Sequence, residues 1–334
     1  MNSFDFNDEI RLLKMSQNWR DHNWDPEASI DWSAGIDFSK PLVSLDEHAF
    51  FFPGASTEQR LAVSQMMGLL IAASIFEMEE SLIRIKSECF LKPFERYPVG
   101  PEFSNLGEQF FAEEVKHSAV FKRYFELYSE KLGVDPVDFL AILPQVRNSN
   151  TEAILKFHAN QGGHAFWWIV AIVEQEFLEI YRKLKPHAAH LEPLYFKLHQ
   201  LHYEEEIRHA PFPLMMLDFL KATETKPLHY LLGKFDLVAA QVLQGTWTML
   251  SIRRLRKIKK FKGIDPFFDI LIDMLPQMEQ QNTLHIMYKL FTQTPYVSTF
   301  VNPAGTAKIL KFAKEQGKFS LPFPGIDTSE AVDY

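Results

Sequence analysis

The sequence predicts an all-α protein whose core is a four-helix bundle, with additional N- and C-terminal helices. Long segments carry apolar residues at spacings of three and four, which is the pattern of one face of an α-helix. Runs that alternate with a period of two are few, and no Asn-Gly or Asp-Gly hairpin signal separates them. Two Glu-x-x-His steps, Glu114 to His117 and Glu206 to His209, lie in separate helical segments. Paired steps of this kind are typical of bundles that hold two metal ions.

The first two helices of the bundle are predicted at residues 57–92 and 103–131. Apolar residues recur at helical spacing through the first segment, and Pro93 follows its end. Gly133 and Pro136 close the second segment, because both residue types disfavour continuation of a helix. A shorter helix is expected to follow.

The third helix is predicted at residues 151–184, with local loosening at the glycine pair 162–163. The fourth begins near residue 191 and carries the second Glu-x-x-His step. Pro211 and Pro213 come directly after that step. Because proline removes a backbone hydrogen bond, the fourth helix is expected to bend or restart there.

The chain is expected to divide into three parts. Residues 1–56 are rich in turn-forming residues and predict an irregular N-terminal wrap, residues 57–222 form the di-metal bundle, and residues 223–334 form a C-terminal helical extension packed on the bundle. In the extension, helices are expected at residues 229–260, 266–288 and 304–316, and an extended tail at residues 321–334.

Glutamate and histidine residues in these segments predict a di-metal site. Residues three or four apart share a helix face, so Glu114 and His117 can bind one ion, and so can Glu206 and His209. A charge at Glu174, directly after the apolar run 165–173, is costly unless it is paired or bound to a metal. Carboxylate and imidazole ligands without thiolate favour two Fe ions, with Mn or a mixed Fe/Mn pair as alternatives. The predicted metal ligands are Glu80, Glu114, His117, Glu174, His202, Glu206 and His209.

The ligand from the first helix is the least decided of these. Glu77, Glu79 and Glu80 compete for the position, and Glu80 is preferred over Glu77, with which it shares a helix face. His199 lies one turn before His202 and is expected to be a core histidine or to support a ligand. Three further acidic residues are expected to be exposed neighbours of the ligands: Glu113, Glu204 and Glu205.

Composition excludes several classes of protein. A formal charge of -8 argues against a nucleic-acid partner, because binding to phosphate needs a net basic face. A basic cluster from Arg253 to Lys262 is interpreted as a solvated helix end or as a dock for an acidic carrier or redox partner. Cys89 is the only cysteine, which excludes an intramolecular disulfide and fits a reducing cytoplasm. The acidic start and the short longest apolar run, residues 165–173, predict a cytoplasmic protein that does not associate with a membrane.

The ligand pattern resembles the ferritin-like di-iron oxygenases that include the p-aminobenzoate N-oxygenases. In that family an additional histidine begins the last motif, and His202 occupies its place; acyl-carrier-protein desaturases and ribonucleotide reductase small subunits lack it. The resemblance covers about residues 58–220. The matching residues are Glu80, Glu114, His117, Glu174, His202, Glu206 and His209.

The resemblance implies a non-haem di-iron oxygenase that uses dioxygen and an electron donor or reductase to oxidise a small organic substrate, by N-oxygenation of an amine in the nearest relatives. It also implies a homodimer, by analogy with other bundle oxygenases. Three alternatives stay open on the residues alone: an acyl-chain desaturase or C–H hydroxylase, ferritin-like iron binding without catalysis, and a structural helical protein.

Overall fold

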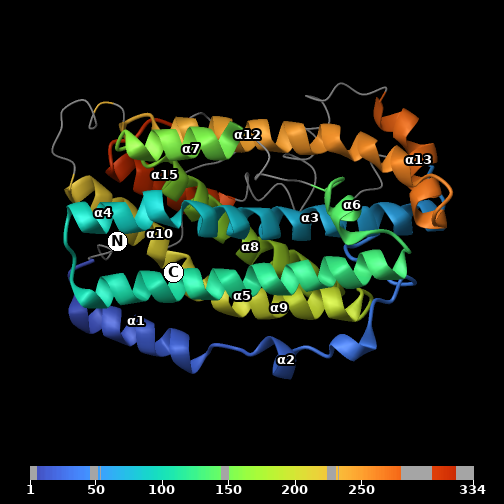
Figure 1. Cartoon of the computed structure of the whole chain (residues 1–334), viewed down its shortest axis with the longest axis horizontal. Coiled ribbons are helices and arrows are strands. Elements are labelled where there is room, and N and C mark those ends of the chain that lie inside the picture. Colours follow the sequence, from blue (N-terminus) through green and yellow to red (C-terminus); the bar gives the residue numbers. More distant parts are fainter. Residues whose placement is uncertain are drawn as a thin grey trace.

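The computed structural model describes residues 6–45, 52, 54–143, 150–223, 231, 233–279 and 303–320. All regular secondary structure in these ranges is helical. The predicted all-α fold is therefore confirmed. Figure 1 shows that long helices run roughly parallel to the longest axis of the molecule and are stacked in layers.

Four helices form the bundle: α3 (Thr57–Lys86), α5 (Pro101–Lys131), α8 (Ala165–Leu184) and α9 (Pro193–His209). In the bundle, α3 packs along α5, and α8 packs along α9. A capping box between Ser56 and Gln59 starts α3 by satisfying backbone N–H groups of its first turn. The π-helical segment η2 (Ser87–Leu91) and α4 (Lys92–Arg96) extend α3 before the chain turns into α5.

The stretch that contains α3 and its extension, Thr57–Arg96, is the one stretch of the described chain that is long and apolar enough to cross a membrane by length and composition. Within its most apolar window, however, 72% of the residues are buried inside the protein. It packs against α5, α7 and α13, which is the role of a core helix.

Two breaks in the helices define the ends of the bundle. The single helix predicted at residues 151–184 is instead two helices, α7 (Asn150–Asn160) and α8, separated by a turn at Gly162, whose φ of 81° favours glycine. The break predicted after His209 is confirmed, because α9 ends there and α10 (Pro211–Ala222) begins with Pro211 at its first position.

The N-terminal segment differs from the prediction of an irregular wrap. It contains a 13-residue helix, α1 (Glu9–Asp21), followed by α2 (Pro26–Ser29) and η1 (Trp32–Ala34). The Asp8 side chain caps the first turn of α1, and Trp19 is among the residues that α1 buries. Figure 1 shows this segment running beside α5 and α9.

The C-terminal part covers the opposite side of the bundle. Its described helices are α12 (Asp236–Arg254), η4 (Leu255–Phe261), α13 (Pro266–Glu279) and α15 (Pro303–Glu315). Both α12 and α15 pack on α8, while α13 packs on α3. Parts of the helices predicted at 229–260 and 266–288, and the tail predicted at 321–334, lie outside the described residues. The remaining short elements are α6 (Pro136–Leu140) and η3 (Lys185–His187).

Candidate metal centre

The four bundle helices bring acidic and imidazole side chains together in the protein interior. Helix α3 contributes Glu79, α5 contributes Glu114 and His117, α8 contributes Glu174, and α9 contributes three residues. None of these residues is more than 2% exposed. The three from α9 are His202, Glu206 and His209.

Six of these side chains form two overlapping groups that could each hold a metal ion. In each group the ligand atoms lie within 4.8 Å of one another. His117 and Glu206 belong to both groups, so the two groups share a boundary. The first group is Glu79, His117, His202 and Glu206; the second is Glu114, His117, Glu206 and His209.

Glu206 lies between the two groups and faces imidazoles on both sides. Its Oε1 lies 3.2 Å from His117 Nδ1 and 2.9 Å from His202 Nε2, while its Oε2 lies 3.4 Å from His209 Nδ1. A carboxylate with one oxygen toward each group is placed to bridge two ions. At the outer ends, His202 Nε2 lies 3.0 Å from Glu79 Oε1, and His209 Nδ1 lies 3.0 Å from Glu114 Oε1.

Glu174 lies beside this cluster, although it belongs to neither group of four. Burial raises the pKa of its carboxyl well above the usual value, and the nearby charges of Glu206 and Glu114 raise it further. The Glu174 side chain of α8 therefore lies close to the carboxylates of Glu206 and Glu114.

The structure does not bring Glu80, the preferred residue of the first helix, to the cluster. The Glu80 side chain is 32% exposed, pairs with Arg84 at 3.3 Å and accepts a hydrogen bond from Ser118. Glu79 takes the place instead, because it lies on the same buried stripe of α3 as Ile75 and other apolar residues at helical spacing.

Two further glutamates hold ligand histidines in a crossed arrangement. His117 of α5 donates from Nε2 to Glu205 Oε2 of α9 at 2.6 Å, and His209 of α9 donates to Glu113 Oε2 of α5 at 2.8 Å. An ionised carboxylate only accepts, so Nε2 of each imidazole carries a proton; when a metal ion binds, Nδ1 would release its own proton and offer its lone pair to the ion.

Glu113 and Glu205 were expected to be exposed, and this prediction is wrong, because both are buried. Glu204 is exposed as expected. The signal was the doubled glutamate in each step, Glu-Glu-x-x-His.

The buried charges of the centre depend on one another. Burial alone would lower the pKa of His117, but Glu205 and Glu206 outweigh it and raise that pKa to about 10. Burial raises the pKa of Glu79 to about 7. Protons on imidazoles thus offset part of the carboxylate charge in the metal-free protein.

The donor set fits two divalent cations. The four carboxylates, when ionised, carry the charge that two such cations offset, and the three imidazoles add neutral nitrogen ligands. Buried atoms without a hydrogen-bond partner are otherwise costly. Among the described residues such atoms gather here: Glu79 Oε2, Glu114 Oε1, His117 Nδ1, Glu174 Oε2, both oxygens of Glu206, and His209 Nδ1.

Aromatic rings surround the imidazoles and exclude water from the centre. The His202 ring packs against Phe121 and Phe177, with centroids 5.4 and 5.1 Å away. The His209 ring lies 5.1 Å from Trp19 of α1 and 5.0 Å from Phe110 of α5. Such apolar walls strengthen the electrostatic interactions inside. His199, next to Tyr195 and Phe121, is a buried core histidine.

Two solved structures are similar to the chain in fold. Both are point mutants described as an R2-like ligand-binding oxidase with an aerobically reconstituted Mn/Fe cofactor. One mutant is 15% identical, with a TM-score of 0.48, over 81% of this chain and 93% of that one. The other mutant is 15% identical, with a TM-score of 0.47, over 91% of this chain and 93% of that one.

No curated protein matches the chain. A family model described as p-aminobenzoate N-oxygenase AurF matches residues 7–232, which is more than half of the chain and includes all of the clustered side chains. This protein therefore belongs to the p-aminobenzoate N-oxygenase AurF family.

Proposed function

We propose that the protein is a non-haem di-iron oxygenase that uses dioxygen to oxidise a small organic substrate, with Glu79 in place of the expected Glu80 among the ligands. The observation that carries the proposal is the pair of buried four-residue groups that share His117 and Glu206. Manganese, alone or with iron, accepts the same oxygen and nitrogen ligands. The proposed ligand set is Glu79, Glu114, His117, Glu174, His202, Glu206 and His209.

The family description indicates an amine nitrogen as the acceptor of oxygen. In the balanced reaction, an amine, dioxygen, two electrons and two protons give a hydroxylamine and water. One oxygen atom forms the new N–O bond, and the other leaves as water. The two bound ions would supply the positions at which dioxygen is reduced. The two electrons come from an external donor, which we propose to be a reductase or a small reductant.

The chain's own residues hold and shield this chemistry. Glu206 would hold both ions, because its oxygens face imidazoles on both sides. Glu205 and Glu113 fix the ring orientation of His117 and His209. The aromatic walls keep bulk water out, which limits loss of reducing equivalents to solvent.

Product analysis tests the proposal directly. Protein reconstituted anaerobically with ferrous iron is mixed with a reductant, ¹⁸O₂ and p-aminobenzoate or another aniline. We expect two irons per chain and one ¹⁸O atom in the hydroxylamine product. His209→Ala should lose iron and activity, whereas Glu204→Gln, a change at an exposed neighbour on the same helix, should keep both.

Other outcomes of this experiment would overturn the proposed reaction. Ferric mineral well beyond two ions per chain, with no oxidised product, would indicate iron storage. Oxidation of an acyl chain while every aniline tested stays unchanged would indicate a desaturase or hydroxylase.

We also propose a cytoplasmic location and a homodimer. The location is supported by the single cysteine, Cys89, which is a buried thiol. The homodimer rests on analogy with other bundle oxygenases. Light scattering of the purified protein at two concentrations measures the assembly, and a monomer mass at both would refute the dimer.

A further inference from the structure

The two Glu-Glu-x-x-His segments of α5 and α9 correspond residue by residue. Glu113 corresponds to Glu205, and each of them accepts a hydrogen bond from the histidine of the other segment. Lys116 and Arg208, each directly before its histidine, also correspond to each other. The same five-residue pattern on α5 and on α9 thus supplies residues to the two sides of the centre.

The cation that completes this arrangement is present on one side only. Lys116 Nζ donates to Glu205 Oε1 at 2.6 Å, so Glu205 uses one oxygen for His117 and the other for an ammonium group. By the same correspondence, the Arg208 side chain would donate a hydrogen bond to Glu113. The Arg208 side chain instead donates to the Glu204 and His22 carbonyl oxygens and lies 3.5 Å from Glu205.

Within the described part of the chain, Glu113 therefore lacks a hydrogen-bond donor for one of its two carboxylate oxygens. Its Oε2 accepts from His209, while its Oε1 is buried and has no hydrogen-bond partner among the described residues. The residue is only 4% exposed. A buried carboxylate oxygen without a donor is costly, and a cationic donor stabilises it most.

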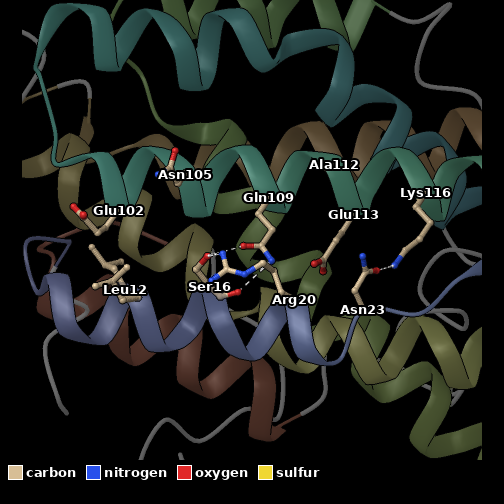
Figure 2. Close-up of a pocket in the computed structure, with 11 residues that line it drawn as sticks. Leu12, Ser16, Arg20, Asn23, Glu102, Asn105, Gln109, Ala112, Glu113 and Lys116 are labelled. Atoms are coloured by element: carbon tan, nitrogen blue, oxygen red, sulfur yellow. Dashed lines mark hydrogen bonds between the residues drawn. The ribbon is translucent and has the colours of Figure 1, made fainter.

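A groove between α1 and α5 is lined in part by Glu113, the residue that carries this oxygen. It has a volume of about 470 Å³, a size typical of small-molecule sites, and Glu113 and Lys116 are among its lining residues. Figure 2 shows the Glu113 side chain pointing from α5 into the space toward α1. Arg20, the cation on the α1 side, is held by Ser16 at 2.7 Å and by Gln17 at 3.0 Å on its own helix.

We propose that this groove binds a small molecule that carries a primary ammonium group, and that the ammonium donates to Glu113 Oε1 as Lys116 donates to Glu205. The rim offers apolar contacts from Leu12, Leu13 and Ala112 and polar contacts from Asn105 and Gln109, which suits a short alkylamine or arylalkylamine.

The ligand acts on the centre indirectly. Its nitrogen is separated from the ions by Glu113 and His209, so it is an effector and is not itself oxidised. By holding Glu113 in place it also holds the His209 ring, and the ion bound there is released more slowly.

Calorimetric titration of the metal-loaded protein under nitrogen tests the proposal, with benzylamine as the probe and benzyl alcohol as its uncharged match, at constant ionic strength. We expect saturable 1:1 binding of benzylamine, and at least tenfold weaker binding of benzyl alcohol. Glu113→Gln should weaken benzylamine binding at least tenfold. Benzylamine should also slow the transfer of metal to a chelator severalfold in the unmodified protein and have no such effect in Glu113→Gln.

Two variants separate the groove from general effects on α5. Ala112 lies exposed on the groove wall, and Ala119 lies exposed two turns further along the same helix and does not line the groove. Ala112→Phe should weaken benzylamine binding at least tenfold and keep two metal ions per chain, whereas Ala119→Phe should leave both unchanged.

The proposal is overturned if benzylamine shows no saturable binding up to about 10 mM, a limit that corresponds to a very weak interaction. It is equally overturned if benzyl alcohol binds as tightly, if Ala112→Phe binds normally, or if bound benzylamine is oxidised once dioxygen is admitted. The binding measurements exclude dioxygen, so they stand apart from success or failure of the proposed oxygenation.

Discussion

The crossed glutamates make a quantitative prediction about metal affinity. Glu205 is fully buried and accepts from His117 Nε2 and Lys116 Nζ, both at 2.6 Å. Glu205→Gln puts one carbonyl oxygen and one amide NH₂ group opposite two donors, so one donor meets another donor in place of an acceptor. Lys116 keeps Asn23 and the Trp24 carbonyl as partners. Loss of a carboxylate behind a metal-bound imidazole weakens metal binding about 10- to 100-fold, or about 1.4–2.7 kcal/mol. We expect Glu205→Gln at the upper end of this range.

Glu113→Gln should give a smaller loss, about tenfold, because its carbonyl oxygen still accepts from His209 and no lysine depends on it. Competition with a metal-binding indicator under nitrogen measures both affinities. Glu204→Gln is the matched control, since Glu204 is exposed and hydrogen-bonded to Gln200 on the surface of α9. The reasoning is refuted if the three variants bind metal equally well, or if Glu113→Gln is more damaging than Glu205→Gln.

Three further predictions concern the site and the core. Glu79→Ala should lose at least one of two metal ions, while Glu80→Ala keeps both; the metal content of desalted protein distinguishes them, and the opposite result would restore Glu80 as the ligand. Burial lowers the pKa of His164 to about 4 from 6.5, so the unfolded chain takes up a proton at a pH where the folded protein does not. The contribution of the neutral His164 side chain to the free energy of unfolding is fully present above pH 6.5 and is lost as the pH drops toward 4. The free energy of unfolding in urea should therefore decrease by about 2 kcal/mol between about pH 7.5 and 5 through this group, and His164→Gln should lack that decrease. A Cβ added at Gly107 would lie 2.2 Å from an aromatic ring, so Gly107→Ala should destabilise the protein by about 1–3 kcal/mol in urea unfolding. In Gly245→Ala the added Cβ meets nothing within 4 Å, and a stabilising change of up to about 1 kcal/mol is expected; equal effects at the two glycines would contradict the packing of α5.

Features that depend on local chemistry were predictable from the sequence. The all-α fold and the family were recognised correctly, because helical periodicity and the two Glu-x-x-His steps are written in contiguous residues. The restart at Pro211 followed from the missing N–H of proline. Six of the seven expected metal-binding side chains do lie together in the interior.

Features that depend on tertiary packing were not predictable in this way. Residues 77–80 of α3 contain three glutamates, and only the orientation of the folded helix decides that Glu79 faces the centre. Glu113 and Glu205 look like surface residues until the opposite helix supplies a histidine to each. Helix α1 was missed because its stability comes from contacts with α5 and from Trp19, which a single segment cannot reveal.

The position of α1 has a consequence for how metal enters and leaves. Trp19 lies against His209, and Trp24, just beyond α1, is stacked on His117 at 6.2 Å between ring centroids. Both indoles come from a segment that contacts α5 and α9 through side-chain packing and a few side-chain hydrogen bonds. We therefore expect this segment to open before the four bundle helices unfold. We expect exchange of metal ions with solution to depend on how often this segment opens. A chain shortened to begin after Asp25 should exchange its metal faster, without any loss of helical content in the bundle.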